Sequence, residues 1–262
     1  MKLGFIGCGK MASAIIKGII SSGTKFEIKG SELNPDIAYE AQNRLKIPVL
    51  TDNKMLALDS DIIFIAVKPN CVSAVLEDIK GELTSEKLIV SIAAGVKTSK
   101  IEEIIGDMRV VRVMPNTPAL VLEGMSAICK GKHAKEDDVN TVFGLLKNIG
   151  KCIEVQENQM DIVTAISGSG PAFFYKVIED IARAGEKLGL EYDKALLLAT
   201  QTALGSANMV FNKADLSLQT LIDNVATKGG CTFVGITEMK KSDKLFYDVI
   251  KKTTKKASAL GK

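Results

Sequence analysis

The sequence predicts a doubly wound parallel α/β domain over residues 1–155 and an all-helical domain over residues 156–262. Three observations support this fold class. Short apolar runs rich in β-branched residues alternate with segments of helical periodicity in the first domain. The runs are apolar throughout, as strands covered by helices on both faces must be. After Gln156 the strand signals stop and long helical patterns follow.

The first domain carries seven strand-like runs. Helical segments over residues 10–23 and 35–45 separate the earliest of them, which is typical of parallel β-α-β units. The last three runs are expected to extend the same sheet. The seven runs cover residues 2–7, 26–31, 61–69, 87–95, 109–120, 124–131 and 151–156.

The second domain carries three long helical patterns, over residues 169–190, 192–211 and 233–256. The middle pattern has small residues, such as Ala199 and Ala203, on nearly every side. Such a helix packs closely all round, and a small helical domain offers too little surface to cover it. We therefore infer that part of it is buried against a second copy of the chain. The alternative is a core helix of a monomer.

Composition and charge exclude several classes of protein. A net charge of +3 is too small to predict nucleic-acid binding, and the basic stretch Lys251–Lys256 is interpreted as a solvated helix face. The five cysteines are scattered without a C-x-x-C spacing, which predicts no metal site and favours a reducing compartment. No charged leader precedes the first strand, and no apolar stretch approaches the roughly 20 residues of a membrane span. We expect a cytoplasmic protein with no membrane partner and no nucleic-acid partner.

A glycine-rich motif follows the first strand and opens the first helix. In this G-x-G-x-x-A pattern, Gly7 allows the tight turn and Gly9 lets the backbone approach a pyrophosphate. Ala12 permits close packing of helix on strand, and the helix N-terminus offers amide donors to the phosphates. The context predicts a Rossmann-type domain that binds NAD or NADP. The predicted cofactor-binding residues here are Gly7, Cys8, Gly9, Lys10, Met11 and Ala12.

An acidic residue roughly 20 positions beyond the glycines is expected to bind the adenosine ribose. Glu32 is the candidate, and Asn34 lies close by in sequence. Ser31 and Asn34 could instead hydrogen-bond the 2′-phosphate of NADP, and Glu32 could be a solvent-exposed loop charge. The choice between NAD and NADP therefore stays open, although a carboxylate here favours tolerance of NADH.

Further strand ends are expected to line the same crevice, because ligands of open α/β sheets lie beyond the carboxyl ends of the strands. Two of these ends are the stretches "AVKP" and "AAG". A third is the turn "MPNTP", in which two prolines restrict the backbone so that it presents polar groups. The predicted contacts are Val67, Lys68, Pro69, Ala93, Ala94, Gly95 and Asn116.

As a set, the motifs resemble the pyrroline-5-carboxylate reductase family in order and spacing, over essentially the whole chain. The matching stretches are "GFIGCGKMASAI", "AVKP", "SIAAGV", "MPNTPALV", "SGSGPAF" and the Gly-Gly-x-Thr of "KGGCT". The resemblance implies an N-terminal Rossmann domain, a C-terminal helical dimerisation domain, and higher oligomers built from dimers. It also implies hydride transfer from NADPH or NADH to a cyclic imine, in the last step of proline synthesis.

The resemblance carries over to particular residues. It implies that Asn53 meets the adenosine ribose, that the loop 226–232 holds the pyrroline carboxylate, and that Thr232 hydrogen-bonds the ring nitrogen. One departure affects the substrate. The family loop usually reads Ser-Pro-Gly-Gly-x-Thr, whereas this chain has Thr227 and Lys228 before the glycines. Thr227 keeps a hydroxyl, but Lys228 removes a rigid proline and adds a cation beside the carboxylate site.

The residues that are absent favour an imine over a carbonyl substrate. The one histidine, His133, lies in a polar stretch away from the strand ends, where it is expected to be a surface residue. The β-hydroxyacid dehydrogenases share the domain plan, but their catalytic Lys follows a Gly-x-Gly sooner than Lys176 does here. A protonated C=N bond is already electrophilic, so positioning and one hydrogen bond can suffice.

The stretch "GGCT" is interpreted as a substrate cradle. Its glycines let backbone amides converge on a carboxylate at the start of the next helix, while Thr232 faces the ring nitrogen. Cys231 contributes its amide only, because no histidine is at hand to activate the thiol. In the alternative, Thr232 is a helix N-cap. The predicted substrate-binding residues are Thr227, Gly229, Gly230, Cys231 and Thr232, with Thr232 as the catalytic residue.

A secondary candidate is "SGSGP", Ser167–Pro171. Pro171 in the first turn of a long helix, with Ser169 near its cap, explains this motif structurally, although the glycines would also allow a ligand to approach.

Two other functions stay open from the sequence alone. One is reduction of another small imine or hydroxy acid, and the other is nucleotide binding without catalysis.

Overall fold

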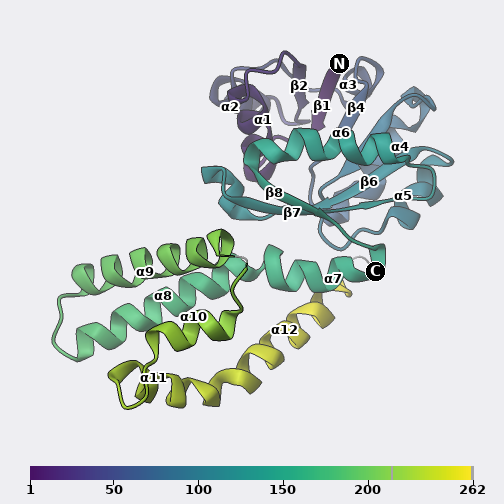
Figure 1. The fold of residues 1–262 in the computed structure, drawn as a ribbon. Coiled ribbons are helices and arrows are strands. Elements are labelled where there is room, and N and C mark those ends of the chain that lie inside the picture. The colour runs from purple at the N-terminus through teal and green to yellow at the C-terminus, as the bar shows by residue number, and fades with distance from the viewer. Residues whose placement is uncertain (214, 261–262) are drawn as a thin grey trace. The chain divides into compact units, whose positions relative to one another are not determined.

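The computed structural model describes residues 1–213 and 215–260, which form two compact units (Figure 1). The first unit comprises Met1–Ser169 together with the chain from Lys251 onward, and the second comprises Gly170–Ile250. The domain boundary that we place at residue 155 remains a prediction. The last two residues of the predicted helical domain, 261–262, lie outside the described part of the chain.

The first unit is built on an eight-stranded sheet in the order β3-β2-β1-β4-β5-β6-β7-β8. Strands β1 to β6 are parallel, and the chain winds outward in both directions from β1. This arrangement confirms the doubly wound fold class. The strands are β1 (Lys2–Ile6), β2 (Glu27–Ser31), β3 (Val49–Leu50), β4 (Ile62–Ile65), β5 (Leu88–Ser91), β6 (Arg109–Met114), β7 (Gly124–Lys130) and β8 (Gly150–Glu154).

The last two strands run in the opposite direction to the others. Strand β7 pairs antiparallel with β6, and β8 pairs parallel with β7. A parallel crossover needs a dozen or more residues, usually including a helix, whereas only residues 115–123 separate β6 from β7. This short connection, with a 3-10 turn over Thr117–Val121, brings the chain straight back beside β6. The expected extension of the sheet is therefore present, but it is antiparallel to the rest.

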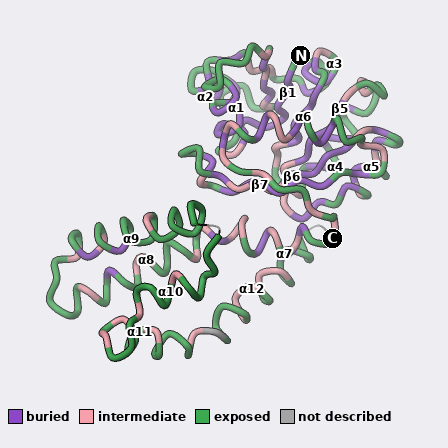
Figure 2. The backbone as a smooth tube through the Cα atoms, in the orientation of Figure 1, coloured by how far each residue is buried: buried purple, intermediate pink, exposed green. Residues whose placement is uncertain are grey.

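Helices cover both faces of the sheet. Helices α1 (Lys10–Ser21), α2 (Pro35–Leu45) and α6 (Glu136–Leu146) pack over one face, and α3 (Asn53–Leu58), α4 (Val72–Ile79) and α5 (Thr98–Ile105) over the other. Each face has its own apolar cluster, and Figure 2 shows the central strands as largely buried. The rings of Phe5 and Phe64 stack in the first cluster with centroids 4.4 Å apart. This core holds the carboxyl ends of the strands in fixed register.

A short connecting segment, residues 157–168, follows β8 and belongs to the first unit. It consists of a 3-10 turn (Glu157–Gln159), helix α7 (Met160–Val163) and a π-helical turn (Thr164–Gly168). Its Met160 and Ala165 are fully buried. π-Helical turns are rare and occur frequently at functional sites, so this segment is of interest beyond its role as a connection.

The second unit is helical. Helices α8 (Gly170–Lys187) and α9 (Tyr192–Asn212) lie side by side, followed by α10 (Leu218–Val225) and α11 (Cys231–Met239) (Figure 1). Helix α12 (Asp243–Ala257) starts in this unit and ends in the first. The pattern over residues 233–256, expected as one helix, is thus divided between α11 and α12 by a 3-10 turn at Lys240–Ser242. Among the described helices, none has the length and apolar character needed to span a membrane.

Candidate active site

The glycine turn after β1 has the geometry that dinucleotide binding requires. Gly7 has φ +92°, and a Cβ placed there would lie 2.8 Å from the carbonyl oxygen of Ala66. Gly9 is the N-cap residue of α1 and has no atom within 4 Å of a built Cβ. No side chain caps this helix, so its first amides are open to an anion. These residues fit the pyrophosphate of a dinucleotide.

Cys8, between the two glycines, is a buried filler. Burial, reinforced by the charge of Glu32, raises the pKa of its thiol to about 12, so the thiol stays protonated and unreactive at neutral pH. Its sulfur occupies the space beside Gly30 on β2, where a Cβ would lie 2.4 Å from Sγ. Sequence reasoning missed Gly30, although an isolated glycine within a strand is a known signal of close approach.

Glu32 meets the glycine turn directly. Its Oε1 accepts a hydrogen bond of 2.6 Å from the amide of Cys8, so the carboxylate is half-buried and is not a solvated loop charge. From the other side, Nη2 of Arg44 donates to the Cys8 carbonyl at 2.6 Å and to Ser13 Oγ at 3.3 Å. Both the amide and the carbonyl group of Cys8 are therefore hydrogen-bonded to side chains. Arg44 belongs to no recognisable motif, so sequence reasoning does not find it.

The polar residues near β2 make hydrogen bonds within the chain. Asn34 caps α2, because its Oδ1 accepts from the amides of Asp36 and Ile37. Ser31 is fully buried and donates to Oδ1 of Asn53 at 2.8 Å, and Asn53 is itself buried. Burial of Ser31 counts against the alternative in which it binds a 2′-phosphate. The roles predicted for Asn34 and Asn53 toward the cofactor stay predictions.

The other predicted cofactor residues gather at the same carboxyl edge of the sheet. Strands β1, β4 and β5 are neighbours, so the loops that follow them meet there. Val67 packs against the turn, since a Cβ on Gly7 would lie 3.1 Å from its Cγ1. The next loop turns at Gly95, with φ +79°. In these stretches Ala12, Ala93 and Gly95 are buried, Met11, Val67, Pro69 and Ala94 are partly buried, and Lys10 and Lys68 are exposed.

Asn116, in the loop after β6, is buried and fully engaged. Its Oδ1 accepts from the amide of Met125 at 2.8 Å, and its Nδ2 donates to the carbonyl oxygen of Ser167 at 3.2 Å. The loop after β6 is thereby tied both to β7 and to the π-helical turn. Asn116 therefore has a structural explanation of its own, and contact with a cofactor stays a prediction.

The predicted substrate loop lies in the second unit and contains a tight turn. The amide of Gly230 donates to the carbonyl of Thr227 at 2.9 Å, and Gly229 has φ +82°. A positive φ at the third residue of such a turn strongly favours glycine. Gly230 lies close to Thr227, since a Cβ there would lie 2.9 Å from Oγ1 and 3.1 Å from the carbonyl oxygen of Thr227. Gly229 is thus explained by its backbone conformation, and Gly230 lies where the turn packs closely on Thr227.

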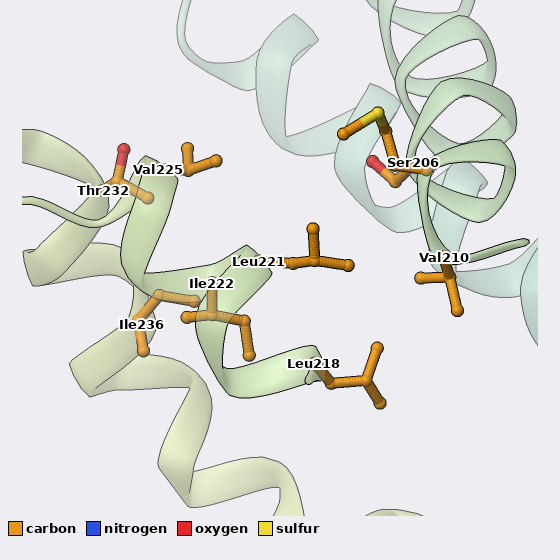
Figure 3. Close-up of a pocket in the computed structure, with 9 residues that line it drawn as sticks. Ser206, Val210, Leu218, Leu221, Ile222, Val225, Thr232 and Ile236 are labelled. Carbon is orange, nitrogen blue, oxygen red and sulfur yellow. The ribbon is translucent and has the colours of Figure 1, made fainter. Parts of the chain in front are cut away.

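Thr232 does not cap the helix that follows. Helix α11 begins at Cys231, its N-cap residue is Gly230, and no side chain caps it, so the capping alternative for Thr232 is wrong. Thr232 instead lines one end of a cavity of about 350 Å³ formed by α9, α10 and α11 (Figure 3). Its hydroxyl points away from Ile222 and Ile236. The cavity itself is lined almost entirely by apolar side chains.

The predicted cofactor and substrate residues therefore fall into two groups. The first gathers at the carboxyl edge of the sheet, and the second surrounds the N-terminus of α11 in the helical unit. Neither group includes an acid-base pair of the kind used by carbonyl reductases. His133 pairs with Asp107 at 3.2 Å, and Lys176 pairs with Asp180 one helical turn away on α8. Within the described residues no group of side chains could hold a metal ion.

A glycine turn opening onto the carboxyl edge of a mostly parallel sheet, followed by a helical unit, is the arrangement of a dinucleotide-dependent oxidoreductase. Residues 2–95 match the family model described as NADP oxidoreductase, coenzyme F420-dependent. Residues 157–260 match the model for pyrroline-5-carboxylate reductase dimerisation.

Comparison with individual proteins gives the same assignment over the full length. The chain is 40% identical to the pyrroline-5-carboxylate reductase of Methanosarcina acetivorans, with 100% of this chain and 98% of the relative covered. The NADP-bound Plasmodium falciparum pyrroline carboxylate reductase superposes with TM-score 0.88 at 35% identity, covering 100% and 98% of the two chains. The Coxiella burnetii enzyme gives TM-score 0.92 at 32% identity, covering 99% and 98%. The chain belongs to the pyrroline-5-carboxylate reductase family.

Proposed function

We propose that the chain reduces 1-pyrroline-5-carboxylate to L-proline with NADPH or NADH, as the last step of proline synthesis. The observation that carries the proposal is the position of Thr232. It lies in the first turn of α11, directly after the Gly229–Gly230 turn, at a helix start that no side chain caps. A hydroxyl beside open backbone amides suits a small ring that bears both a nitrogen and a carboxylate.

The residues around the start of α11 would bind and orient the substrate. The free amides at the start of α11 bind the substrate carboxylate, and Thr227 adds a hydroxyl at the edge of the turn. The Thr232 hydroxyl accepts the N–H of the protonated imine and keeps that bond as the nitrogen becomes an amine. Lys228 brings a positive charge to the carboxylate in place of a rigid proline.

The cofactor group would be held by the sheet unit. The Gly7–Gly9 turn and the N-terminus of α1 take the pyrophosphate, and Glu32 lies where an adenosine ribose is expected. When bound, the reduced nicotinamide supplies a hydride to the imine carbon. Hydride addition neutralises the iminium charge, so no residue has to deliver a proton to a developing oxyanion.

We also propose that dimers assemble into larger oligomers and that the enzyme works in the cytoplasm. The family resemblance supports the first proposal. The second is supported by five cysteines that are all free thiols, which is typical of a reducing compartment. A net charge of +3 gives no reason to expect a nucleic-acid partner.

The test is a spectrophotometric assay of NADPH and NADH oxidation with pyrroline-5-carboxylate, run on wild type, Thr232→Ala and Cys231→Ser. Loss of a hydrogen bond to a charged nitrogen should lower kcat/KM of Thr232→Ala by roughly ten- to a hundredfold, or about 1.5 to 3 kcal/mol. Cys231→Ser should stay within a few fold of wild type, because the proposal gives the thiol no chemical role.

Each outcome decides between named alternatives. If the cofactor were not oxidised with pyrroline-5-carboxylate while 2-hydroxy acids were turned over, the chain would be a hydroxyacid dehydrogenase instead. An inactive Cys231→Ser beside an active Thr232→Ala would overturn the cradle in favour of a nucleophilic cysteine. Thermal denaturation of both variants separates a kinetic effect from a loss of folding.

A further inference from the structure

An ion pair between a buried arginine and a partly buried glutamate joins the connecting segment 157–168 to the sheet. Arg112 on β6 is only 1% exposed, and its Nη1 pairs with Oε1 of Glu157. Burial raises the pKa of the Glu157 carboxyl, but the charge of Arg112 and side-chain hydrogen bonds from Thr98, Arg112 and Cys129 outweigh it and hold the pKa below its usual value. The carboxylate is therefore ionised at neutral pH. A charged pair in this position calls for an explanation, because burying charge is costly.

The second oxygen of the same carboxylate binds the start of α5. Oε2 of Glu157 accepts from Oγ1 of Thr98 at 2.8 Å and from its amide at 3.3 Å. Thr98 is the first residue of α5, and Lys97 before it supplies no side-chain cap. A carboxylate at a helix N-terminus satisfies open amides and matches the helix dipole. Glu157 thus caps α5 from 59 positions further along the chain.

The loop that leads into α5 is one of the predicted cofactor loops, Ala93–Gly95. It leaves β5 directly, turns at Gly95 with φ +79°, and reaches Thr98 three residues later. The loop is thus fixed by β5 at one end and by the first turn of α5 at the other. Any shift of that first turn would move the loop, and Glu157 holds the turn in place.

The other end of segment 157–168 is attached to a second predicted cofactor loop. Asn116 donates to the carbonyl oxygen of Ser167. Gly168 lies against Met114, since a Cβ there would approach Cε of Met114 to 2.4 Å. The segment is therefore bonded at one end to the first residue of α5, which follows the loop after β5, and at the other to the loop after β6. It also begins the part of the chain that matches the dimerisation model, 157–260.

We propose that Glu157 is a positioning residue for the cofactor site, which holds the Ala93–Gly95 loop in its binding conformation through Thr98 while Arg112 fixes its carboxylate. The segment leading into the dimerising helices thereby sets the geometry of a cofactor loop. The inference rests on the proposed cofactor site, but it does not depend on which imine is reduced.

The same strand provides a matched control at its other end. Arg109 pairs with the buried carboxylate of Asp138 at 2.7 Å, and Asp138 also accepts from the amide of Lys135, the N-cap residue of α6. Both pairs thus join an arginine of β6 to a carboxylate at a helix N-terminus. The Arg109 pair lies at the amino end of the strand, away from the carboxyl edge. Asp138→Asn therefore disturbs a similar pair without touching a cofactor loop.

The experiment measures the Kd for NADPH by fluorescence titration without imine substrate, alongside thermal unfolding, for Glu157→Gln, Thr98→Val and Asp138→Asn. Glu157→Gln should weaken NADPH binding by roughly two- to thirtyfold at temperatures where it is folded. Thr98→Val keeps the ion pair and loses only the hydroxyl bond, so it should weaken binding in the same direction but less. Asp138→Asn should lower the unfolding temperature with an unchanged Kd.

Equal effects of Glu157→Gln and Asp138→Asn on Kd would overturn the proposal, because both would then act through general stability. A wild-type Kd in Thr98→Val would also overturn it, even if Glu157→Gln did not fold. Wild type that binds neither NADPH nor NADH would overturn both this inference and the proposed function. Wild type that binds NADPH but fails to reduce pyrroline-5-carboxylate would reject the proposed function alone.

Discussion

The two units of the molecule bury their side chains very differently (Figure 2). The sheet unit has a closed apolar cluster on each face of the sheet. In the described residues of the helical unit, 170–213 and 215–250, the buried apolar side chains are the small ones Ala182, Ala195 and Ala199. These alanines belong to α8 and α9. The sheet unit thus has its own core. The described helices of the helical unit pack closely through these alanines but form no core of large apolar side chains.

The large apolar side chains of the helical unit are on its surface. Leu197, Leu204 and Phe211 on α9 are 69%, 54% and 64% exposed, and they recur every seven residues along one face of the helix. Exposed apolar stripes of this kind mark an association surface. The dimerisation family that matches residues 157–260 supplies the partner, a second copy of the chain. The inference from the small residues of the middle helix agrees with this self-association.

The largest effect is expected from a charge in that stripe. Leu204→Asp would place an unpaired carboxylate against apolar surface of the partner, which should weaken the dimer by on the order of 3 kcal/mol, or roughly a hundredfold. The matched control is Leu58→Asp, a leucine of α3 in the sheet unit that is 59% exposed. Light scattering and steady-state kinetics should show a dissociated, poorly active Leu204→Asp and a normal Leu58→Asp. A fully active monomer of Leu204→Asp would show that the helical unit functions without its partner.

A smaller effect is expected within the sheet unit, where one chain supplies all the predicted cofactor residues. Glu32 can accept from ribose hydroxyls but repels a 2′-phosphate, so Glu32→Ser should shift the ratio of kcat/KM for NADPH over NADH upward by roughly three- to tenfold. Its bond to the Cys8 amide places the carboxylate on the cofactor turn. The ratio is measured for both cofactors in wild type and variant. An unchanged ratio would place Glu32 outside the recognition of the ribose.

Much of the sheet unit could be predicted from the sequence because strand and turn signals are local. The glycine turn was found because Gly7 and Gly9 follow an apolar strand at fixed spacing. The strands β7 and β8 were expected, but their reversed direction was missed, because an apolar run does not reveal its direction. The short connection after β6 was the available signal.

The contacts that position the site could not be predicted, because they join residues far apart in sequence. Arg112 lies in a strand pattern, and nothing near it indicates a carboxylate 45 positions later. Arg44 reaches Cys8 across 36 positions. In the helical unit, the motif pattern predicts a role toward a ligand for Gly229 and Gly230. The structure adds local reasons that hold without a ligand: the positive φ of Gly229 and the close approach of Gly230 to Thr227.

The smallest effect concerns the turn Thr227–Gly230, where the family resemblance leads us to expect a proline in place of Lys228. Lys228 occupies the second position of the turn, where proline is favoured, and its amide makes no hydrogen bond to the described residues. Lys228→Pro should therefore raise the free energy of unfolding by about 0.4 to 1 kcal/mol, mainly by restricting the unfolded chain. Lys228→Ala is the control, since it removes the charge without stiffening the turn. Thermal unfolding and the KM for the imine substrate are measured for both. A higher KM in both variants would show that the Lys228 cation binds the carboxylate, whereas destabilisation by proline alone would show that this turn needs a conformation that proline cannot adopt.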